Sequence, residues 1–154
     1  MTAAEALAAF RARFPDASPR LPDSAPAASV SAADLRAHLL YLRDTLRFDF
    51  LVFVSALDLP DRASQELVYR LFSYETKLAV VVRVLLPRDG GTVDTVSDIY
   101  RTAEWHERET AEMFGIVFAG HPDPRKLLLP DDIDGHPLRK DFTHPNMIRL
   151  PEVE

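Results

Sequence analysis

Apolar residues recur at helical spacing in two N-terminal segments of the chain. In residues 3–14 the large apolar side chains are separated by alanines, which predicts a helix. Ser31 has the side chain of an N-cap for a second helix, whose apolar stripe should face a core. The stripe consists of Leu35, Leu39, Leu42 and Leu46. Between these helices, residues 15–30 hold four prolines and predict an extended linker.

From Phe48 onward the pattern changes to that of strands. Residues 48–59 (FDFLVFVSALDL) are dominated by Phe, Val and Leu, which predicts a well-buried strand. In residues 66–75, two sets of side chains alternate: Leu67, Tyr69, Leu71 and Ser73 on one face, and Val68, Arg70 and Phe72 on the other. Residues 77–87 are rich in β-branched side chains. A tight turn near Thr76 would join these two segments, so the sequence predicts an antiparallel hairpin.

Residues 95–115 form the last segment with a helical pattern. They predict one helix or two abutting helices, with Ser97 as a candidate N-cap and Gly115 as a C-terminal stop. The prolines that follow, and the lack of a helical stripe, predict an irregular extended tail. We therefore expect an α+β fold in which helices pack on a small, mainly antiparallel sheet. Residues 1–118 would form a single domain, with the tail spanning residues 119–154.

Composition narrows the classes of function. The chain has 154 residues, which suits one domain with a real core. It contains no cysteine, which excludes disulfides, thiolate nucleophiles and cysteine-ligated iron–sulfur clusters. The net charge of −6 and the scattered basic residues argue against nucleic-acid binding. No window approaches the roughly 18 consecutive apolar residues of a membrane span, so we expect no direct membrane span.

One catalytic motif comes close to fitting and fails, and others are absent. The HERET stretch is similar to the zinc motif His-Glu-x-x-His, but Thr110 stands where the second histidine is required. The chain also lacks a glycine-rich phosphate loop and a GxSxG nucleophile elbow. Its five histidines are His38, His106, His121, His136 and His144. Their convergence on a metal would make the chain a small histidine-based metalloenzyme, which we keep as a lesser alternative.

A dense run of charges precedes the apolar end of the last helical segment. On a helix, Arg108 would lie four residues from both Glu104 and Glu112 and could pair with each. Together with Glu107 and Glu109, these charges spread around most of the helix circumference, so they cannot share one solvent face. We predict buried ion pairs at an interface, where such pairs specify partner and register. A solvated charged face is the alternative.

The stretch ERETAEMFGIVFAGHPDPRK at 107–126, followed by GHPLRKDF at 135–142, resembles the C subunit of the respiratory NADH:quinone oxidoreductase, complex I. The match is close over roughly residues 95–142. The resemblance implies a non-catalytic subunit of the peripheral arm of a proton-translocating enzyme, docked on the D subunit that forms the quinone site. NADH, flavin, iron–sulfur clusters and quinone would be bound by other subunits, and no cofactor or metal by this chain. The location implied is the cytoplasmic face of the plasma membrane.

The same resemblance assigns a partner interface to the residues that match the family motifs. They are Glu107, Arg108, Glu109, Glu112, Gly115, Gly120, His121, Pro122, Asp123, Arg125, Lys126, Gly135, His136, Pro137, Leu138, Arg139, Lys140 and Asp141. Ala111 stands where the family usually has an aromatic residue, and Pro124 where it usually has leucine. The missing aromatic leaves space that a partner must fill. Similar subunits occur in membrane-bound hydrogenase-like and ferredoxin-linked complexes, so an equivalent role there is the alternative.

Overall fold

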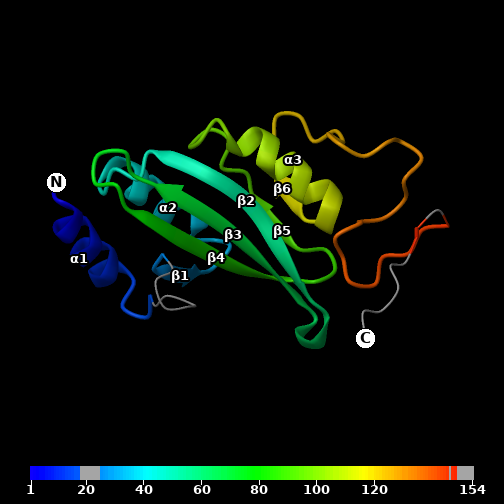
Figure 1. Ribbon diagram of the computed structural model, residues 1–154, viewed down its shortest axis with the longest axis horizontal. Helices are drawn as coiled ribbons and strands as arrows, with labels where there is room; N and C mark the ends of the chain where they lie inside the picture. The colour runs from blue at the N-terminus through cyan, green and yellow to red at the C-terminus, as the bar shows by residue number, and fades with distance from the viewer. Residues whose placement is uncertain (18–24, 146, 149–154) are drawn as a thin grey trace.

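A four-stranded sheet forms the centre of the protein (Figure 1). The computed structural model describes residues 1–17, 25–145 and 147–148. The strands are β1 (Ala27–Val30), β2 (Phe50–Leu59), β3 (Ser64–Phe72) and β4 (Ala79–Pro87). Their order is β1-β4-β3-β2, and only the β1–β4 pair is parallel. The predicted hairpin and the mainly antiparallel sheet are both confirmed.

Helices accompany the sheet and complete the predicted α+β fold. They are α1 (Ala3–Arg13), α2 (Leu35–Asp44) and α3 (Ala103–Phe114), and a 3₁₀ turn, η1 (Pro60–Arg62), joins β2 to β3. In Figure 1, α2 lies against one face of the sheet and α3 runs along its β2 edge. All four leucines of the predicted α2 stripe are buried. None of the helices in the described part of the chain is long and apolar enough to cross a membrane.

The start of α2 differs from its prediction by one turn. Ser31 does not cap the helix, which begins at Leu35 after Asp34. Instead, the Ser31 hydroxyl accepts the Asp34 N–H at 3.1 Å and donates to the Asp34 carboxylate at 2.7 Å. These local bonds stabilise a turn ahead of the helix, because Ser and Asp side chains compete well for nearby backbone groups.

Strand β2 is less buried than predicted. Its residues alternate between buried and exposed, and Phe50, Val52 and Leu57 keep 37%, 37% and 41% of their surface exposed. The run of apolar residues in β2 is therefore not a sign that both faces of the strand are buried. The described helices cover one face of the sheet and leave residues of the other face partly open.

Three short strands were not predicted from the sequence. Strand β1 lies inside the segment predicted to be a linker and pairs with β4. Strands β5 (Thr92–Asp94) and β6 (Val117–Ala119) form a separate parallel pair. Strands of three or four residues carry too little periodicity to be recognised, and their partners lie far away in the sequence.

Helix α3 begins at Ala103, so the prediction of a helix from residue 95 is wrong for its first part. Ser97 does not cap it; its N–H donates to the Thr95 hydroxyl at 3.2 Å. The Tyr100 hydroxyl donates to the backbone oxygen of Phe48 at 2.8 Å. This bond attaches the turns that precede α3 to the rest of the domain.

Helix α3 protects the edge of the sheet that β2 would otherwise expose. The hydroxyls of Thr102 and Thr110 lie 3.3 Å and 3.2 Å from the backbone oxygens of Leu51 and Val54. An unprotected edge strand is a template for unwanted pairing with other chains. Thr110, which removed the zinc motif from consideration, thus helps to hold α3 on the sheet.

Residues 120–145 contain no helix or strand and loop around the end of α3 (Figure 1), as predicted for the tail. A buried ion pair at the end of the sheet binds this segment to the domain. Arg88 contacts both carboxylate oxygens of Asp58 at 2.8 Å, and the Lys140 N–H donates to Asp58 at 2.8 Å. The Asp58 side chain is fully buried. A domain boundary at residue 118 remains a prediction.

Replacement of Asp58 by asparagine should lower stability in a pH-dependent way. Arg88 and the Lys140 N–H lower the pKa of Asp58 to about 2, so its contribution is present above the ordinary Asp range and is lost as pH falls toward that value. We expect Asp58→Asn to cost on the order of 2 kcal/mol near neutral pH, from loss of hydrogen bonds to a charged group. Urea unfolding should show this difference shrinking in acid. Asp61→Asn, at an exposed position on η1, is the matched control, and a pH-independent loss would contradict the assignment.

Candidate docking site around helix α3

The C-terminal end of α3 receives its hydrogen-bond donors from the segment that follows it. An α-helix leaves its last four carbonyls without partners inside the helix. The pairs are Gly115 N–H with Ala111 O (2.8 Å), His136 Nδ1 with Glu112 O (2.8 Å), Leu138 N–H with Met113 O (3.1 Å) and Arg139 Nε with Phe114 O (2.9 Å). The second Gly-His-Pro motif and the residues after it therefore act as a cap for α3.

Gly115 is required at this cap for two independent reasons. Its φ of +77° lies in the left-handed region, where a side chain is unfavourable. A Cβ atom at this position would also lie 2.6 Å from two atoms of the His136 ring. The predicted role of Gly115 as the C-terminal stop is confirmed, and the position also makes room for the loop to return.

Glu112 fixes the first part of the loop to the side of α3. Its carboxylate accepts the backbone N–H groups of Leu127, Leu128 and Leu129 at 3.0, 2.8 and 3.3 Å. The residue keeps only 7% of its surface exposed. Charged acceptors form hydrogen bonds that are stronger than neutral ones, so this carboxylate is an anchor for three successive backbone groups.

Arg108 does not make the ion pairs with Glu104 and Glu112 that the sequence predicted. Its guanidinium donates to the backbone oxygens of Arg125 at 2.9 Å and Lys126 at 2.8 Å. It also lies 3.4 Å from a carboxylate oxygen of Asp123. The folded loop brings these acceptors alongside the helix, so Arg108 pairs with them and not with the two glutamates. In this position the Arg108 side chain is 11% exposed.

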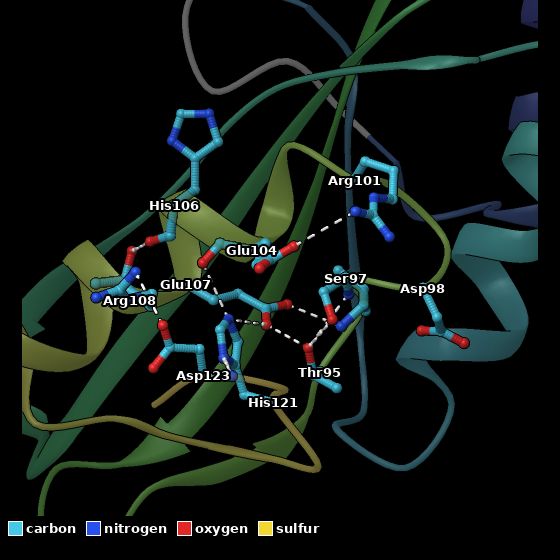
Figure 2. A network of polar contacts seen from close by, with 12 residues as sticks. Thr95, Ser97, Asp98, Arg101, Glu104, His106, Glu107, Arg108, His121 and Asp123 are labelled. Carbon is cyan, nitrogen blue, oxygen red and sulfur yellow. Dashed lines mark hydrogen bonds and ion pairs between the residues drawn. The ribbon is translucent and has the colours of Figure 1, made fainter. Parts of the chain in front are cut away.

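Glu107 is fully buried and points toward the turn that precedes α3 (Figure 2). Its carboxylate accepts the Val96 N–H at 2.8 Å and the Thr95 hydroxyl, and lies 3.8 Å from His121 Nε2. Burial raises the pKa of Glu107, and the two hydrogen bonds oppose this effect only in part. The geometry makes Glu107 a structural link between α3 and the β5–α3 turn.

His121 holds the start of the loop against α3. Its Nδ1 accepts the Asp123 N–H at 3.0 Å, so the proton lies on Nε2, which donates to the Glu104 backbone oxygen at 3.0 Å. Gly120 precedes it with a φ of +76°, which allows the sharp turn out of β6. Figure 2 shows His121 between Glu107 and Asp123, whereas His106 points away from this network.

The remaining predicted interface residues also lie on α3 or on the loop of residues 120–145, and several have partners within the chain. Arg125 pairs with both carboxylate oxygens of Asp123 at 2.7 and 2.8 Å, and Asp141 lies 2.8 Å from Arg88. Lys126 Nζ contacts two backbone oxygens of the loop. The exposed members are Glu109, Gly120, Pro122, Arg125, Lys126, Gly135, Leu138, Lys140 and Asp141. Contact of these residues with a partner remains a prediction.

Within the described residues, no group of three or more His, Cys, Asp or Glu could hold a metal ion. His121 and His136 instead contact backbone oxygens of α3, and His38 packs edge-on against Phe14. The convergence of histidines that the metalloenzyme alternative requires does not occur in this part of the chain.

Several residues that support the loop or the buried acids were not predicted from the sequence. Thr95, Asp58 and Arg88 have this role, yet none belongs to a recognisable motif. The buried amide of Gln65 donates to the Phe114 oxygen at 2.9 Å. Of these residues, only Thr95 had a signal in the local sequence. It stands two positions before Ser97, and Thr and Ser side chains favour turns.

Substitution of Glu112 by glutamine should open the first part of the loop without unfolding the domain. An amide NH₂ would face backbone N–H groups, so at least one charge-assisted bond would be lost. We expect amide hydrogen exchange at residues 127–129 to accelerate roughly 10- to 100-fold, with little change in β3 and β4. NMR exchange measurements test this, with Glu109→Gln as the exposed control on the same helix. Equal acceleration throughout the sheet would contradict a local anchor.

A second prediction concerns the buried carboxyl of Glu107. Its raised pKa means that folding favours the protonated form, so ionisation costs stability as pH rises through that pKa. Compared with Glu107→Gln, the natural protein should become progressively less stable as pH rises above the ordinary glutamate range and through the raised pKa of Glu107. Urea unfolding at several pH values measures this difference. Glu109→Gln should change stability by less than about 0.5 kcal/mol, as for most surface substitutions. A constant Glu107→Gln difference across the range would refute the burial effect.

Known proteins are similar to this chain in sequence and in architecture. The model of the family described as "Respiratory-chain NADH dehydrogenase, 30 Kd subunit" matches residues 28–147. The C subunit of F(420)H(2) dehydrogenase from Methanosarcina mazei is 44% identical over 103 residues, which is 66% of this chain and 65% of that protein. The C subunit of NADH-quinone oxidoreductase from Moorella thermoacetica is 38% identical over 129 residues, covering 84% and 87%. The C/D subunit of NADH-quinone oxidoreductase from Bdellovibrio bacteriovorus is 41% identical over 73% of this chain but 20% of its own length.

Two solved structures are similar as well. A chain of the archaeal membrane-bound sulfane sulfur reductase aligns with a TM-score of 0.78 and 28% identity, covering 90% of this chain and 84% of that one. A trypsin-resistant fragment of Nqo5 aligns with a TM-score of 0.56 and 28% identity over 64% and 81%. The chain spans less than two thirds of the length of the Methanosarcina relative. Because the family model covers most of the sequence, this chain belongs to the respiratory-chain NADH dehydrogenase 30 kDa subunit family, as its motifs predicted.

Proposed function

We propose that this chain is a non-catalytic peripheral-arm subunit of a proton-translocating NADH:quinone oxidoreductase, and that it docks through α3 and its loop on the D subunit, which forms the quinone site. One observation carries the proposal: hydrogen bonds within the chain hold an irregular segment in place around α3. A preorganised surface binds a partner without the entropic cost of ordering a loop. The region around α3 exposes large apolar side chains, namely Trp105, Val117, Leu128 and Leu138, at 58%, 53%, 60% and 54%.

The chain would support electron transfer from NADH to quinone by assembly, with no redox group of its own. NADH, flavin, iron–sulfur clusters and quinone belong to other subunits in this proposal. The two buried acids of α3 support a structural role, because Glu107 and Glu112 accept backbone N–H groups and are committed to the fold. The absence of cysteine agrees with this assignment.

A relative in which the two subunits form one chain supports the D subunit as the partner. The Bdellovibrio protein is named as a C/D subunit, and the part similar to this chain is 20% of its length. Fusion gives two modules a high effective concentration for each other, so it is expected for modules that dock. The complex would place the chain on the cytoplasmic face of the membrane.

A second candidate is the equivalent subunit of a related membrane complex with another electron donor or acceptor. The likeness to a chain of membrane-bound sulfane sulfur reductase, with a TM-score of 0.78, favours this alternative, as does the F(420)H(2) dehydrogenase relative. The same docking surface would serve in either complex. What differs is the set of electron-transfer subunits around it.

Purification of the tagged chain from its own membranes tests both candidates. Co-elution with iron–sulfur subunits, a flavin- and NADH-binding subunit and the D subunit is the expected result. Deletion of the gene should abolish quinone reduction by NADH in membranes, and complementation should restore it. A complex with a different electron-donor subunit would favour the second candidate. Elution of the chain alone, or oxidation of NADH by the isolated chain, would refute the docking function.

Arg108→Ala should reduce the amount of assembled complex. The substitution removes two hydrogen bonds between α3 and the loop, which we expect to weaken loop attachment by on the order of 2 kcal/mol. The matched control is Arg11→Ala, at an exposed position of α1 far from α3 (Figure 1). Native gels of membranes measure assembly, and unfolding of the isolated chain measures stability. Normal assembly of the Arg108→Ala protein would contradict a role for the loop in docking.

A further inference from the structure

A groove crosses α3 at Ala111, between the helix, β6 and the first part of the loop. On one side of Ala111 lies a hollow of about 210 Å³. Its apolar lining comes from Ala111, Ile116, Val117, Phe118 and Pro124. On the other side lies a hollow of about 200 Å³, which shares Arg108, Ala111 and Pro124 with the first. It adds Glu112, whose carboxylate is occupied by backbone N–H groups, and Arg125, Lys126, Gly135 and His136. The two hollows adjoin, because Arg108, Ala111 and Pro124 border both, and together they form the groove.

The apolar end of this groove has room for a large side chain. An engineered protein cavity of about 150 Å³ that is lined by aliphatic and aromatic residues binds benzene, and the hollow beside Phe118 is larger. Val117 lies at its rim and is 53% exposed. Ala111 contributes only a methyl group where a longer side chain would occupy the space. The chain therefore leaves an apolar site open to the outside.

The other end of the groove is basic, although the protein as a whole carries a charge of −6. Arg108, Arg125 and Lys126 also line a third hollow, together with Asp131. Arg108 and Arg125 share the carboxylate of Asp123. Lys126 Nζ contacts the backbone oxygens of Ile133 at 2.8 Å and Pro130 at 3.3 Å. Among the described residues, no carboxylate lies within ion-pair distance of this ammonium group, so its charge is available to an external acid.

We propose that this groove binds an extended acidic segment of another subunit. One aromatic or large aliphatic side chain of that segment fills the apolar hollow at Ala111, and a carboxylate a few residues away contacts Lys126. The apolar anchor supplies buried area, and the carboxylate sets direction and selects against basic segments. This inference rests on the proposed docking function and adds the place and chemistry of the contact.

Capped tetrapeptides provide direct probes in solution. Acetyl-Phe-Gly-Glu-Glu-amide carries both features, acetyl-Ala-Gly-Glu-Glu-amide lacks the anchor, and acetyl-Phe-Gly-Lys-Lys-amide reverses the charge. NMR titration of the full chain should show amide shifts at Ala111, Phe118 and Leu127 with the first peptide. The Ala peptide should bind at least about tenfold more weakly, because burial of one large apolar side chain is worth that much. The Lys peptide should also bind more weakly, because its charges repel Lys126. Equal shifts with all three peptides, or shifts confined to the open sheet face, would overturn the proposal.

Two variants separate the ends of the groove. Ala111→Leu should fill the apolar hollow from inside and abolish binding of the acidic Phe peptide, while spectra of the sheet residues stay unchanged. Lys126→Glu should weaken that peptide at least about tenfold and strengthen the lysine peptide, in keeping with electrostatic selection. Lys77→Glu, at an exposed position in the β3–β4 connection, is the matched control and should change neither. Because Lys126→Glu tests the charge at an exposed site, the proposal remains open to refutation even if Ala111→Leu disturbs folding.

Photocrosslinking within the native complex identifies the occupant. A benzophenone amino acid at Val117 should crosslink to a peptide of another subunit that has a large apolar residue close to Asp or Glu. Crosslinking to a second copy of this chain, to lipid or to a basic segment would overturn the proposal. If the chain purifies with the complex but the benzophenone forms no crosslink, the groove assignment fails while the docking function stands. If no complex is found, the docking function fails whatever the peptides do.

Discussion

The unpaired carbonyls at the end of α3 set the arrangement of the C-terminal part of the protein. Backbone acceptors that are removed from water need donors, and those of Glu112, Met113 and Phe114 find them in residues distant in the sequence, most of them in the loop that follows. Gly115 makes this possible, because its left-handed conformation ends the helix and the missing Cβ leaves room for His136. The loop can then pass close to α3, where the carboxylate of Glu112 accepts its amides.

Several charged residues of α3 hold parts of their own chain in place. Three of these charges position backbone groups of the same chain: Glu107 for the β5–α3 turn, Arg108 and Glu112 for the loop. Their partners are mostly amides and carbonyls, which have no charge of their own to repel or select another protein. In the proposed docking function, recognition rests on what this scaffold displays, namely apolar side chains around α3 and the groove at Ala111 with its basic end.

Much of the fold was predictable because its signals are periodic and local. The leucine stripe of α2, the β3–β4 hairpin and the end of α3 at Gly115 all follow from spacing or from single-residue conformational preference. The predictions failed where the sequence carries no such signal. Burial of β2 depends on which faces the helices cover, and β1, β5 and β6 are too short to carry a pattern. The motif residues lie on α3 and its loop, but their contacts with one another were not predictable from spacing along a helix.

The sequence by itself determined the class of fold, the family and the part of the chain that carries the family motifs, because ordered motifs and apolar periods are written along the chain. It could not determine the partner of each charge. Arg108 had two acids at the correct helical spacing, yet the loop supplied backbone oxygens that surround its guanidinium. Only the tertiary structure decides such competition, because it brings acceptors from distant positions to one side chain. It also decides that the small side chain of Ala111 borders an open groove, since a hollow exists only between elements that have packed.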